Sequence, residues 1–319
     1  MNISFILPVF DDWDAVVFLL KKIDDNLLKV KANFHIYLVN DSASEAKNIE
    51  KIGQIKRTKI SSIEIINLKK NLGHQSAIAI GLAKAHEINP SDFYIIMDSD
   101  GEDNPAHLEE LIQLASEKKT HAIVAQRKTR KARPIFKICY FFFRIIFSLF
   151  TGRKIDFGNY MILPKTIVSK IILESELLQS LPATLLLLKS PIFRLPTKRT
   201  ERLSGDSRMS FTSLVKLGIT HILVFGDTVF TRVFILSSSV FFLTCVLIVY
   251  GVFIKFFSNS APPGWASSFI APLSLVSINL LILSLMAVFL RKGHRTTEGA
   301  SVEKATRKFI KDITPTSQK

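Results

Sequence analysis

Apolar residues in the first 126 positions fall into short runs separated by segments with helical spacing. The runs, rich in Ile, Val, Tyr and Phe, occupy residues 3–10, 35–40, 63–68, 93–98 and 121–126. Between them, apolar side chains recur every three or four residues, as at Ala15, Phe18, Leu19 and Ile23. Strands that alternate with helices in this way predict an α/β fold, with a mostly parallel sheet covered by helices on both faces.

Two long apolar stretches lie near the C-terminus. Residues 233–254 and 266–290 contain no charged side chain. At about 1.5 Å per residue, a helix of either length crosses a hydrocarbon layer of about 30 Å. We therefore expect two transmembrane helices. The alternative is a pair of buried helices in a soluble domain.

Basic residues beside these stretches predict their orientation. Arg232 precedes the first, while Arg291, Lys292 and Arg295 follow the second, and the connector carries only Lys255. Basic residues favour the cytoplasmic side, so both outer ends are expected there. The expected domains are a cytosolic domain at 1–231, a two-helix membrane anchor at 232–290 and a cytosolic basic tail at 291–319.

Composition and charge narrow the function classes. The 48% of apolar residues exclude a disordered chain. Cys139 and Cys245 both lie in apolar runs, which excludes a disulfide framework or a Cys-based zinc site and favours a reducing compartment. A net charge of +15 is compatible with a nucleic-acid-binding protein, but the basic residues concentrate beside the predicted apolar helices. We therefore expect no nucleic-acid partner.

One basic segment has the composition of a membrane-surface element. Residues 118–154 hold eleven Lys or Arg and no Asp or Glu. Within it, residues 135–150 are nearly all apolar, interrupted by Lys137 and Arg144, and are too short to span a bilayer. An amphipathic helix in the headgroup layer fits this pattern, and residues 211–225 are a second candidate. A basic-edged core helix is the alternative.

An acidic cluster follows the fourth predicted strand. Asp98, Asp100, Glu102 and Asp103 place four carboxylates within six positions. Side chains alternate along an extended chain, so Asp98 and Asp100 are expected to point the same way, with a bend at Gly101 bringing Glu102 to them. Such ligands favour Mg²⁺ or Mn²⁺ shared with substrate phosphates. The alternatives are a calcium loop and a solvated acidic turn that caps a helix.

Further polar motifs follow other predicted strands. They are Pro-Val-Phe-Asp-Asp at 8–12, Val-Asn-Asp-Ser at 39–42, and Asn-Leu-Gly-His-Gln-Ser-Ala at 71–77, continuing to Gly81. With Met-Asp-Ser-Asp-Gly-Glu-Asp-Asn-Pro at 97–105 and a basic loop at 199–208, their order resembles the family 2 glycosyltransferases, in the branch of dolichyl- or polyprenyl-phosphate sugar synthases. The resemblance covers residues 1 to about 290 and implies a GT-A-type fold.

The resemblance also implies roles for individual residues. A nucleotide-sugar site would include Pro8, Phe10, Asp41, Asn71, Gly73, Asp98 and Ser99. A divalent metal, Mg²⁺ or Mn²⁺, would bind Asp98, Asp100 and Glu102. Phosphates of donor and acceptor would contact Arg127, Arg199, Arg202, Ser207 and Arg208. The catalytic residues would be Asp98, Asp100, Arg127 and Arg202. One departure is Asn159, where relatives often have a second Asp.

The implied reaction is inverting transfer of a sugar from a nucleoside diphosphate to a polyprenyl phosphate at the cytoplasmic membrane face. The second pKa of a phosphate group is about 6, so the acceptor phosphate is mostly ionised at neutral pH. It then needs little help from a base, and Asn159 in place of a second Asp is compatible with the reaction. Two alternatives stay open: transfer to another membrane glycolipid or envelope oligosaccharide precursor, and a non-catalytic nucleotide-sugar-binding subunit. The sequence names neither sugar nor nucleotide nor acceptor chain length, and a homo-oligomer is compatible with it.

Overall fold

The structure is a computed structural model of the 319-residue chain. It describes residues 1–42, 49–127, 134–198, 211–257, 264–297 and 301–316. The chain divides into two compact units. The sheet unit comprises Met1–Ile145, Arg153–Val224 and Ala300–Lys319, and the hairpin unit comprises Ile146–Gly152 and Phe225–Gly299.

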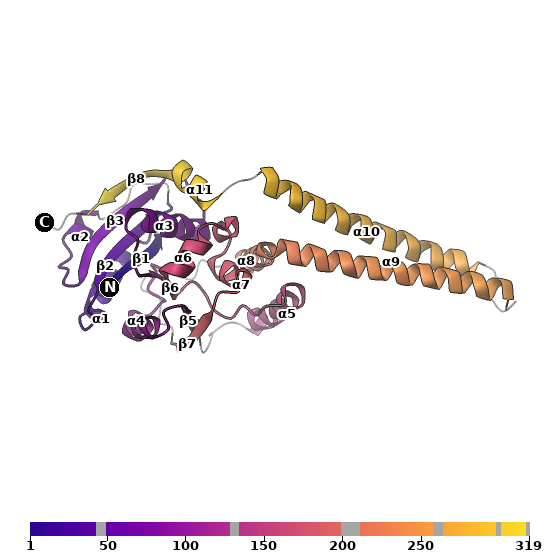
Figure 1. The fold of residues 1–319 in the computed structure, drawn as a ribbon, viewed down its shortest axis with the longest axis horizontal. Coiled ribbons are helices and arrows are strands. Elements are labelled where there is room, and N and C mark those ends of the chain that lie inside the picture. The colour runs from indigo at the N-terminus through magenta and orange to yellow at the C-terminus, as the bar shows by residue number, and fades with distance from the viewer. Residues whose placement is uncertain (43–48, 128–133, 199–210, 258–263, 298–300, 317–319) are drawn as a thin grey trace. The chain divides into compact units, whose positions relative to one another are not determined.

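The sheet unit is built on an eight-stranded sheet, counted over the described residues, in the order β7-β5-β6-β4-β1-β2-β3-β8 (Figure 1). Six strands share one direction, and β6 and β8 run antiparallel to their neighbours. The mostly parallel α/β sheet is confirmed, and all five predicted strands are present. The bounds are β1 Asn2–Val9, β2 Asn33–Asn40, β3 Ile60–Leu68, β4 Phe93–Ile96, β5 Ala122–Arg127, β6 Met161–Pro164, β7 Ile192–Thr197 and β8 Ile310–Pro315.

Helices cover both faces of this sheet because its strands are apolar on both sides. On one face, Phe5 of β1 and Ile36 of β2 join a core cluster with Trp13 of α1 and Leu108 of α4. On the other face lies α3. The helices of this unit are α1 Trp13–Asn26, α2 Ile49–Gly53, α3 His74–Ile88, α4 Leu108–Glu117, most of α5 Pro134–Thr151, α6 Lys165–Ile171, α7 Leu181–Leu187, α8 Phe211–Val224, α11 Val302–Phe309, and the short 3-10 helices η1 Pro105–His107 and η2 Ser175–Leu178.

Gly81 allows α3 to approach the sheet closely. A Cβ atom built at Gly81 would collide with Cγ2 of Val39 on β2 and come within 3.0 Å of Cγ2 of Ile6 on β1. These two side chains leave no room for an added methyl group. Gly81 thus allows the close approach of α3 to β1 and β2.

The C-terminal segment differs from the expected basic tail. After the hairpin unit, Val302–Phe309 forms α11 and Ile310–Pro315 forms β8, which pairs antiparallel with β3 (Figure 1). Ser301 caps α11 by accepting a hydrogen bond from the Lys304 amide at 3.2 Å. Since the sheet contains strands from both before and after the hairpin, both ends of the hairpin lie on the same side of any membrane it crosses.

The hairpin unit contains the two helices expected to span a membrane, α9 Gly226–Phe257 and α10 Trp265–Thr297, which lie side by side (Figure 1). Their segments 226–257 and 268–290 are long and apolar enough to cross a bilayer, and only 11% of each apolar window is buried. This exposure contradicts the alternative of two core helices. Apart from Gly226 at the start of α9, the buried positions are small and recur every seven residues, at Ser237, Thr244 and Gly251 of α9 and at Ser277 and Ser284 of α10.

The two expected amphipathic segments are helical. Residues 135–150 fall within α5, Pro134–Thr151, and residues 211–225 correspond to α8. The described part of α5 exposes Phe141, Phe142 and Leu149. Their placement at a membrane surface stays a prediction, supported by this exposure.

Candidate active site

The candidate site lies at the carboxyl edge of the parallel strands, where ligands bind in open α/β sheets. β1 ends at Val9, β2 at Asn40 and β4 at Ile96. Strand β4 ends two residues before Asp98, and Ser99 and Asp100 form a turn. Asp98 and Asp100 therefore do not lie on the extended chain from which a common direction of their side chains was expected. The expected bend at Gly101 is present, with a φ of 80°.

Hydrogen bonds within the acidic turn hold its shape. The buried Asp103 accepts from the backbone amide of Asp98 at 2.9 Å, and Asp100 accepts from the amide of Glu102 at 3.0 Å. Ser99 is buried, and its hydroxyl donates to the Pro8 carbonyl at 2.7 Å. These bonds tie the acidic turn to the end of β1. Ser99 and Asp103 thus position the turn, while Asp98 and Asp100 remain partly exposed.

Asn104 also shows that part of the turn has a structural task. Its side chain accepts from the Ala106 amide at 3.0 Å and caps the 3-10 helix η1. The capping expected of a simple acidic turn is therefore present, but it involves Asn104 and none of the carboxylates. A strand and not a helix precedes the cluster, which argues against a calcium loop of the helix-loop-helix kind.

Asp41 links two of the predicted motifs. Its carboxylate accepts from the backbone amides of Leu72 at 2.7 Å and Gly73 at 2.9 Å. Asn71 also accepts from the Gly73 amide, at 2.9 Å, and Gly73 has a φ of 88°. Burial raises the pKa of Asp41, although the two amide hydrogen bonds and nearby His74 act in the opposite direction. The structure thus brings Asp41, Asn71 and Gly73 together.

His74, Gln75 and Asn159 form a cluster to which the sequence analysis assigned no role. His74 Nε2 lies 3.0 Å from Asp98 Oδ1 and 3.0 Å from the side-chain amide nitrogen of Asn159. Gln75 Nε2 donates to Asn159 Oδ1 at 3.0 Å, and its own oxygen accepts from the Leu181 amide. Their sequence positions were the available signal: His74 and Gln75 directly follow Gly73, and Asn159 stands where relatives often have a second Asp.

Acidic neighbours control the charge of His74. Burial by itself would lower the pKa of this imidazole, but the carboxylates of Asp98, Asp100 and Asp103 outweigh it and hold the pKa above its usual value. The cation is therefore favoured beside Asp98. His74, the first residue of α3, thus places a positive charge beside the carboxylate of Asp98.

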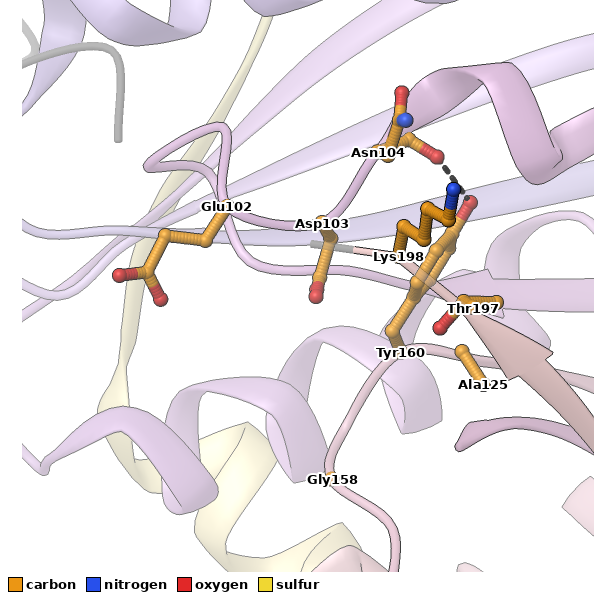
Figure 2. Close-up of a pocket in the computed structure, with 8 residues that line it drawn as sticks. All are labelled: Glu102, Asp103, Asn104, Ala125, Gly158, Tyr160, Thr197 and Lys198. Atoms are coloured by element: carbon orange, nitrogen blue, oxygen red, sulfur yellow. Dashed lines mark hydrogen bonds between the residues drawn. The ribbon is translucent and has the colours of Figure 1, made fainter. Parts of the chain in front are cut away.

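A pocket adjoins the acidic turn (Figure 2). Glu102 and Asp103 contribute from the turn, whereas Thr197 and Lys198 come from the end of β7. Tyr160 donates to the carbonyl of Asn104 at 3.0 Å and closes one side. The complete lining is Glu102, Asp103, Asn104, Ala125, Gly158, Tyr160, Thr197 and Lys198. The pocket therefore reaches the last described residue before the predicted basic loop.

The carboxylates do not form a preassembled cation cage. Within the described ranges, no group of three or more His, Cys, Asp or Glu side chains is arranged to hold a metal ion. Magnesium commonly takes only one or two protein carboxylates together with substrate phosphates, so the donor chemistry of Asp98 and Asp100 fits such an ion. The metal assignment, including Glu102, stays a prediction.

The predicted arginines fall largely outside the described part of the chain. Arg199, Arg202, Ser207 and Arg208 lie outside the described residues. Arg127 is the last residue of β5, and its backbone pairs with Thr197 of β7. Arg127 is therefore paired with a residue that precedes Arg199 by two positions in the sequence. Of the remaining predicted residues, Pro8 is buried and Phe10 is 42% exposed.

Comparison with known proteins gives the family of the chain. Residues 4–170 match the model of glycosyl transferase family 2. The chain belongs to this family. Its sheet with flanking helices is the GT-A-type fold that the resemblance implies.

Relatives of this family 2 chain are distant. It is 23% identical over 296 residues to the uncharacterized glycosyltransferase YkcC of Bacillus subtilis, covering 90% of this chain and 88% of that protein. It is 22% identical over 219 residues to the undecaprenyl-phosphate 4-deoxy-4-formamido-L-arabinose transferase of Klebsiella pneumoniae, covering 68% and 65%.

Among solved structures, similarity extends to glucosyl-3-phosphoglycerate synthase from Mycobacterium tuberculosis in complex with Mn²⁺ and UDP-glucose. The TM-score is 0.49 at 11% identity, covering 72% of this chain and 79% of that one.

Proposed function

We propose that this family 2 chain transfers a sugar, with inversion, from a nucleoside diphosphate to a polyprenyl phosphate at the cytoplasmic face of a membrane. The observation that carries the proposal is the combination, in one chain, of an acidic turn at the carboxyl edge of the sheet and two largely exposed apolar helices. The similarity to the Klebsiella transferase supports the lipid-phosphate class of acceptor.

On the donor side, Asp98, Asp100 and Glu102 are the proposed ligands of Mg²⁺ or Mn²⁺. When bound, the ion would neutralise charge on the departing diphosphate. The exposed ring of Phe10 offers a stacking face to the base, beside Pro8. Asp41 uses its carboxylate to hold the turn at Asn71–Gly73. A direct contact of Asp41 with the base remains part of the proposal, because a carboxylate offers about four acceptor sites.

On the acceptor side, the chain must bring one phosphate next to another. We propose Arg127, Arg199, Arg202, Ser207 and Arg208 for this task. An arginine fork binds phosphate oxygens in pairs and offsets the repulsion between the two anions. The pairing of Arg127 with Thr197 supports a shared location for Arg127 and the start of the basic loop.

The chemical step requires no strong base. With a second pKa near ~6, the acceptor phosphate already carries a nucleophilic oxygen at neutral pH. That oxygen forms a bond to the anomeric carbon on the face opposite the diphosphate, and the sugar–diphosphate bond breaks with its electron pair leaving on the diphosphate oxygen. Asn159 can therefore serve as a scaffold that accepts a hydrogen bond from Gln75.

A transfer assay tests the proposal. Purified chain in detergent, with Mn²⁺, a panel of nucleotide-sugars and radiolabelled polyprenyl phosphate, should yield a labelled, organic-extractable glycolipid. Asp100→Ala should lower the rate by about 100-fold or more, because charge on the leaving group loses its stabilisation. Chelation with EDTA should stop the reaction, and Mn²⁺ should restore it.

Controls separate the alternatives. Asp25→Ala removes an exposed carboxylate on α1, away from the carboxyl edge, and should leave the rate unchanged. Undiminished product from Asp100→Ala would refute the role of that carboxylate. Transfer only to another glycolipid would favour the second acceptor class, and donor binding without any turnover would favour a non-catalytic subunit.

The membrane orientation has its own test. Ser260→Cys introduces a thiol in the connector between the two apolar stretches. In intact cells, an impermeant thiol reagent added from outside should label it. Labelling that requires broken cells would reverse the proposed orientation and contradict a cytosolic active site.

A further inference from the structure

Three polar side chains form a ladder across the last strands of the sheet. Asn40 of β2 pairs in register with Asn67 of β3, and Asn67 pairs with Asp312 of β8. Asn40 Nδ2 donates to Asn67 Oδ1 at 2.9 Å, and Asn67 Nδ2 donates to Asp312 Oδ1 at 2.6 Å. Residues that are paired in register lie side by side on one face of a sheet. The ladder therefore runs from the C-terminal strand to the end of β2.

The ladder ends at the loop of the second predicted motif. Asn40 Oδ1 accepts from the Ser42 hydroxyl at 2.6 Å and from the Ser42 amide at 3.3 Å. A backbone amide can only donate, and an ionised carboxylate can only accept. The two ends of the network thus fix the orientation of both asparagine side chains. The hydrogen bonds all run in one direction, from Ser42 to Asp312.

The same C-terminal segment also holds the turn after β3. The Lys69 amide donates to the Phe309 carbonyl at 2.9 Å, and Lys69 Nζ donates to the Lys308 carbonyl at 2.9 Å. Lys70 Nζ lies 5.1 Å from the centre of the Phe309 ring. Lys69 and Lys70 immediately precede the turn at Asn71–Gly73, which Asp41 binds from the other side. One segment thus contacts the turn after β3 directly and is linked to the loop after β2 through Asn67 and Asn40.

We propose that the C-terminal segment 301–316, which follows the hairpin, is a positioning element of the donor site. Asp312 acts through Asn67 and Asn40 on the loop after β2, and residues 308–309 act on the turn after β3. This inference rests on the proposed function, because it concerns the loops assigned to the nucleotide-sugar. Loops held in place before the donor arrives lose less freedom on binding.

A simpler role for β8 makes a different prediction. If β8 only covers the open edge of β3, changes in the ladder affect stability and leave nucleotide affinity unchanged in the folded protein. A positioning role instead predicts weaker binding of the nucleotide with little change in the acceptor KM. The two roles therefore separate in one set of binding and kinetic measurements.

The experiment reverses the polarity of the Asn67–Asp312 pair. Asn67→Asp places a second carboxylate opposite Asp312, where a donor was, while it can still accept from Asn40. Adding Asp312→Asn supplies a donor at the other position and removes the like-charge pair. The full-length protein in detergent with Mn²⁺ is titrated with UDP, GDP, CDP and TDP, and the nucleotide that wild type binds is used for all variants.

The expected result is a Kd for that nucleotide about tenfold weaker in Asn67→Asp. The double variant should return to within about threefold of wild type. Lys311→Ala, an exposed neighbour of Asp312 on β8, is the matched control and should bind like wild type. Thermal unfolding verifies that each variant is folded, and the acceptor KM should stay within about twofold of wild type in all of them.

Several outcomes would overturn the inference. A folded Asn67→Asp variant with wild-type Kd shows that the ladder does not position the loop. A double variant as weak as the single shows that polarity is not the cause. If Asn67→Asp does not fold, Asp312→Ala, at an exposed position on the edge strand, takes its place. A wild-type Kd in that variant would also overturn the inference. Wild type that binds none of the four nucleotides overturns the proposed function as well.

Discussion

The sheet unit and the hairpin unit place their apolar residues in opposite ways. In the sheet unit, large side chains such as Phe34 and Tyr94 are fully buried, and polar groups collect at the carboxyl edge. In the hairpin unit, large side chains such as Phe242 and Leu243 are exposed, while Ser277 and Thr244 are buried. The first pattern is stabilised by removal of apolar surface from water. The second gains little from that effect unless lipid covers it, so close contact of small residues decides its helix packing.

The largest expected effect is a loss of stability when a core ring of the sheet unit is removed. Phe34→Ala should cost about 3–5 kcal/mol of unfolding free energy, because the ring is fully buried. Phe242→Ala removes the same ring from a position that is 71% exposed and should leave the sheet unit's unfolding unchanged. Fluorescence of buried Trp13, recorded in a Trp265→Phe background, follows the sheet unit alone. Equal losses in both variants would contradict the comparison.

A smaller effect is expected where α3 meets the sheet. Gly81→Ala should destabilise the sheet unit by about 1–3 kcal/mol, because the added methyl collides with Val39 and displaces the helix. On the exposed side of the same helix, Glu87→Ala removes only a surface ion pair with Lys84 and should change stability by less than about 0.5 kcal/mol. Chemical unfolding measured through Trp13 compares the two. A Gly81→Ala variant as stable as wild type would show that the contact relaxes without strain.

A loss of stability of similar size is expected in the hairpin, where α9 packs on α10. Ser277 is 1% exposed, and its hydroxyl already donates to the Ser274 carbonyl of its own helix. Ser277→Leu increases apolarity yet should weaken packing of α9 on α10 by about 1–3 kcal/mol, because the larger side chain forces the helices apart. Ser277→Ala should be close to neutral. Thermal unfolding of the helices by circular dichroism in detergent measures the difference, and a stabilising Ser277→Leu would reverse the comparison.

Several parts of the fold follow from the sequence because they depend on local pattern. The five apolar runs become β1 to β5, and the uncharged stretches become α9 and α10, since periodicity and length are properties of the chain itself. Gly81, at the end of one polar motif, lies where α3 packs closely on the sheet. The acidic turn follows the fourth strand as expected, although β4 ends at Ile96 and Asp98 and Asp100 lie beyond its extended backbone.

Other features were decided only by the tertiary structure. Strand β8 follows the hairpin, and no local pattern indicates that residues 310–315 pair with β3 across more than 240 positions of sequence. The contacts of His74 with Asp98 and Asn159, and of Asp312 with Asn67, likewise join residues from distant segments. The sequence determined which elements form, because each depends on its own residues. Which polar groups meet at the carboxyl edge depends on strand order and register, and these are set by the packing of the whole sheet.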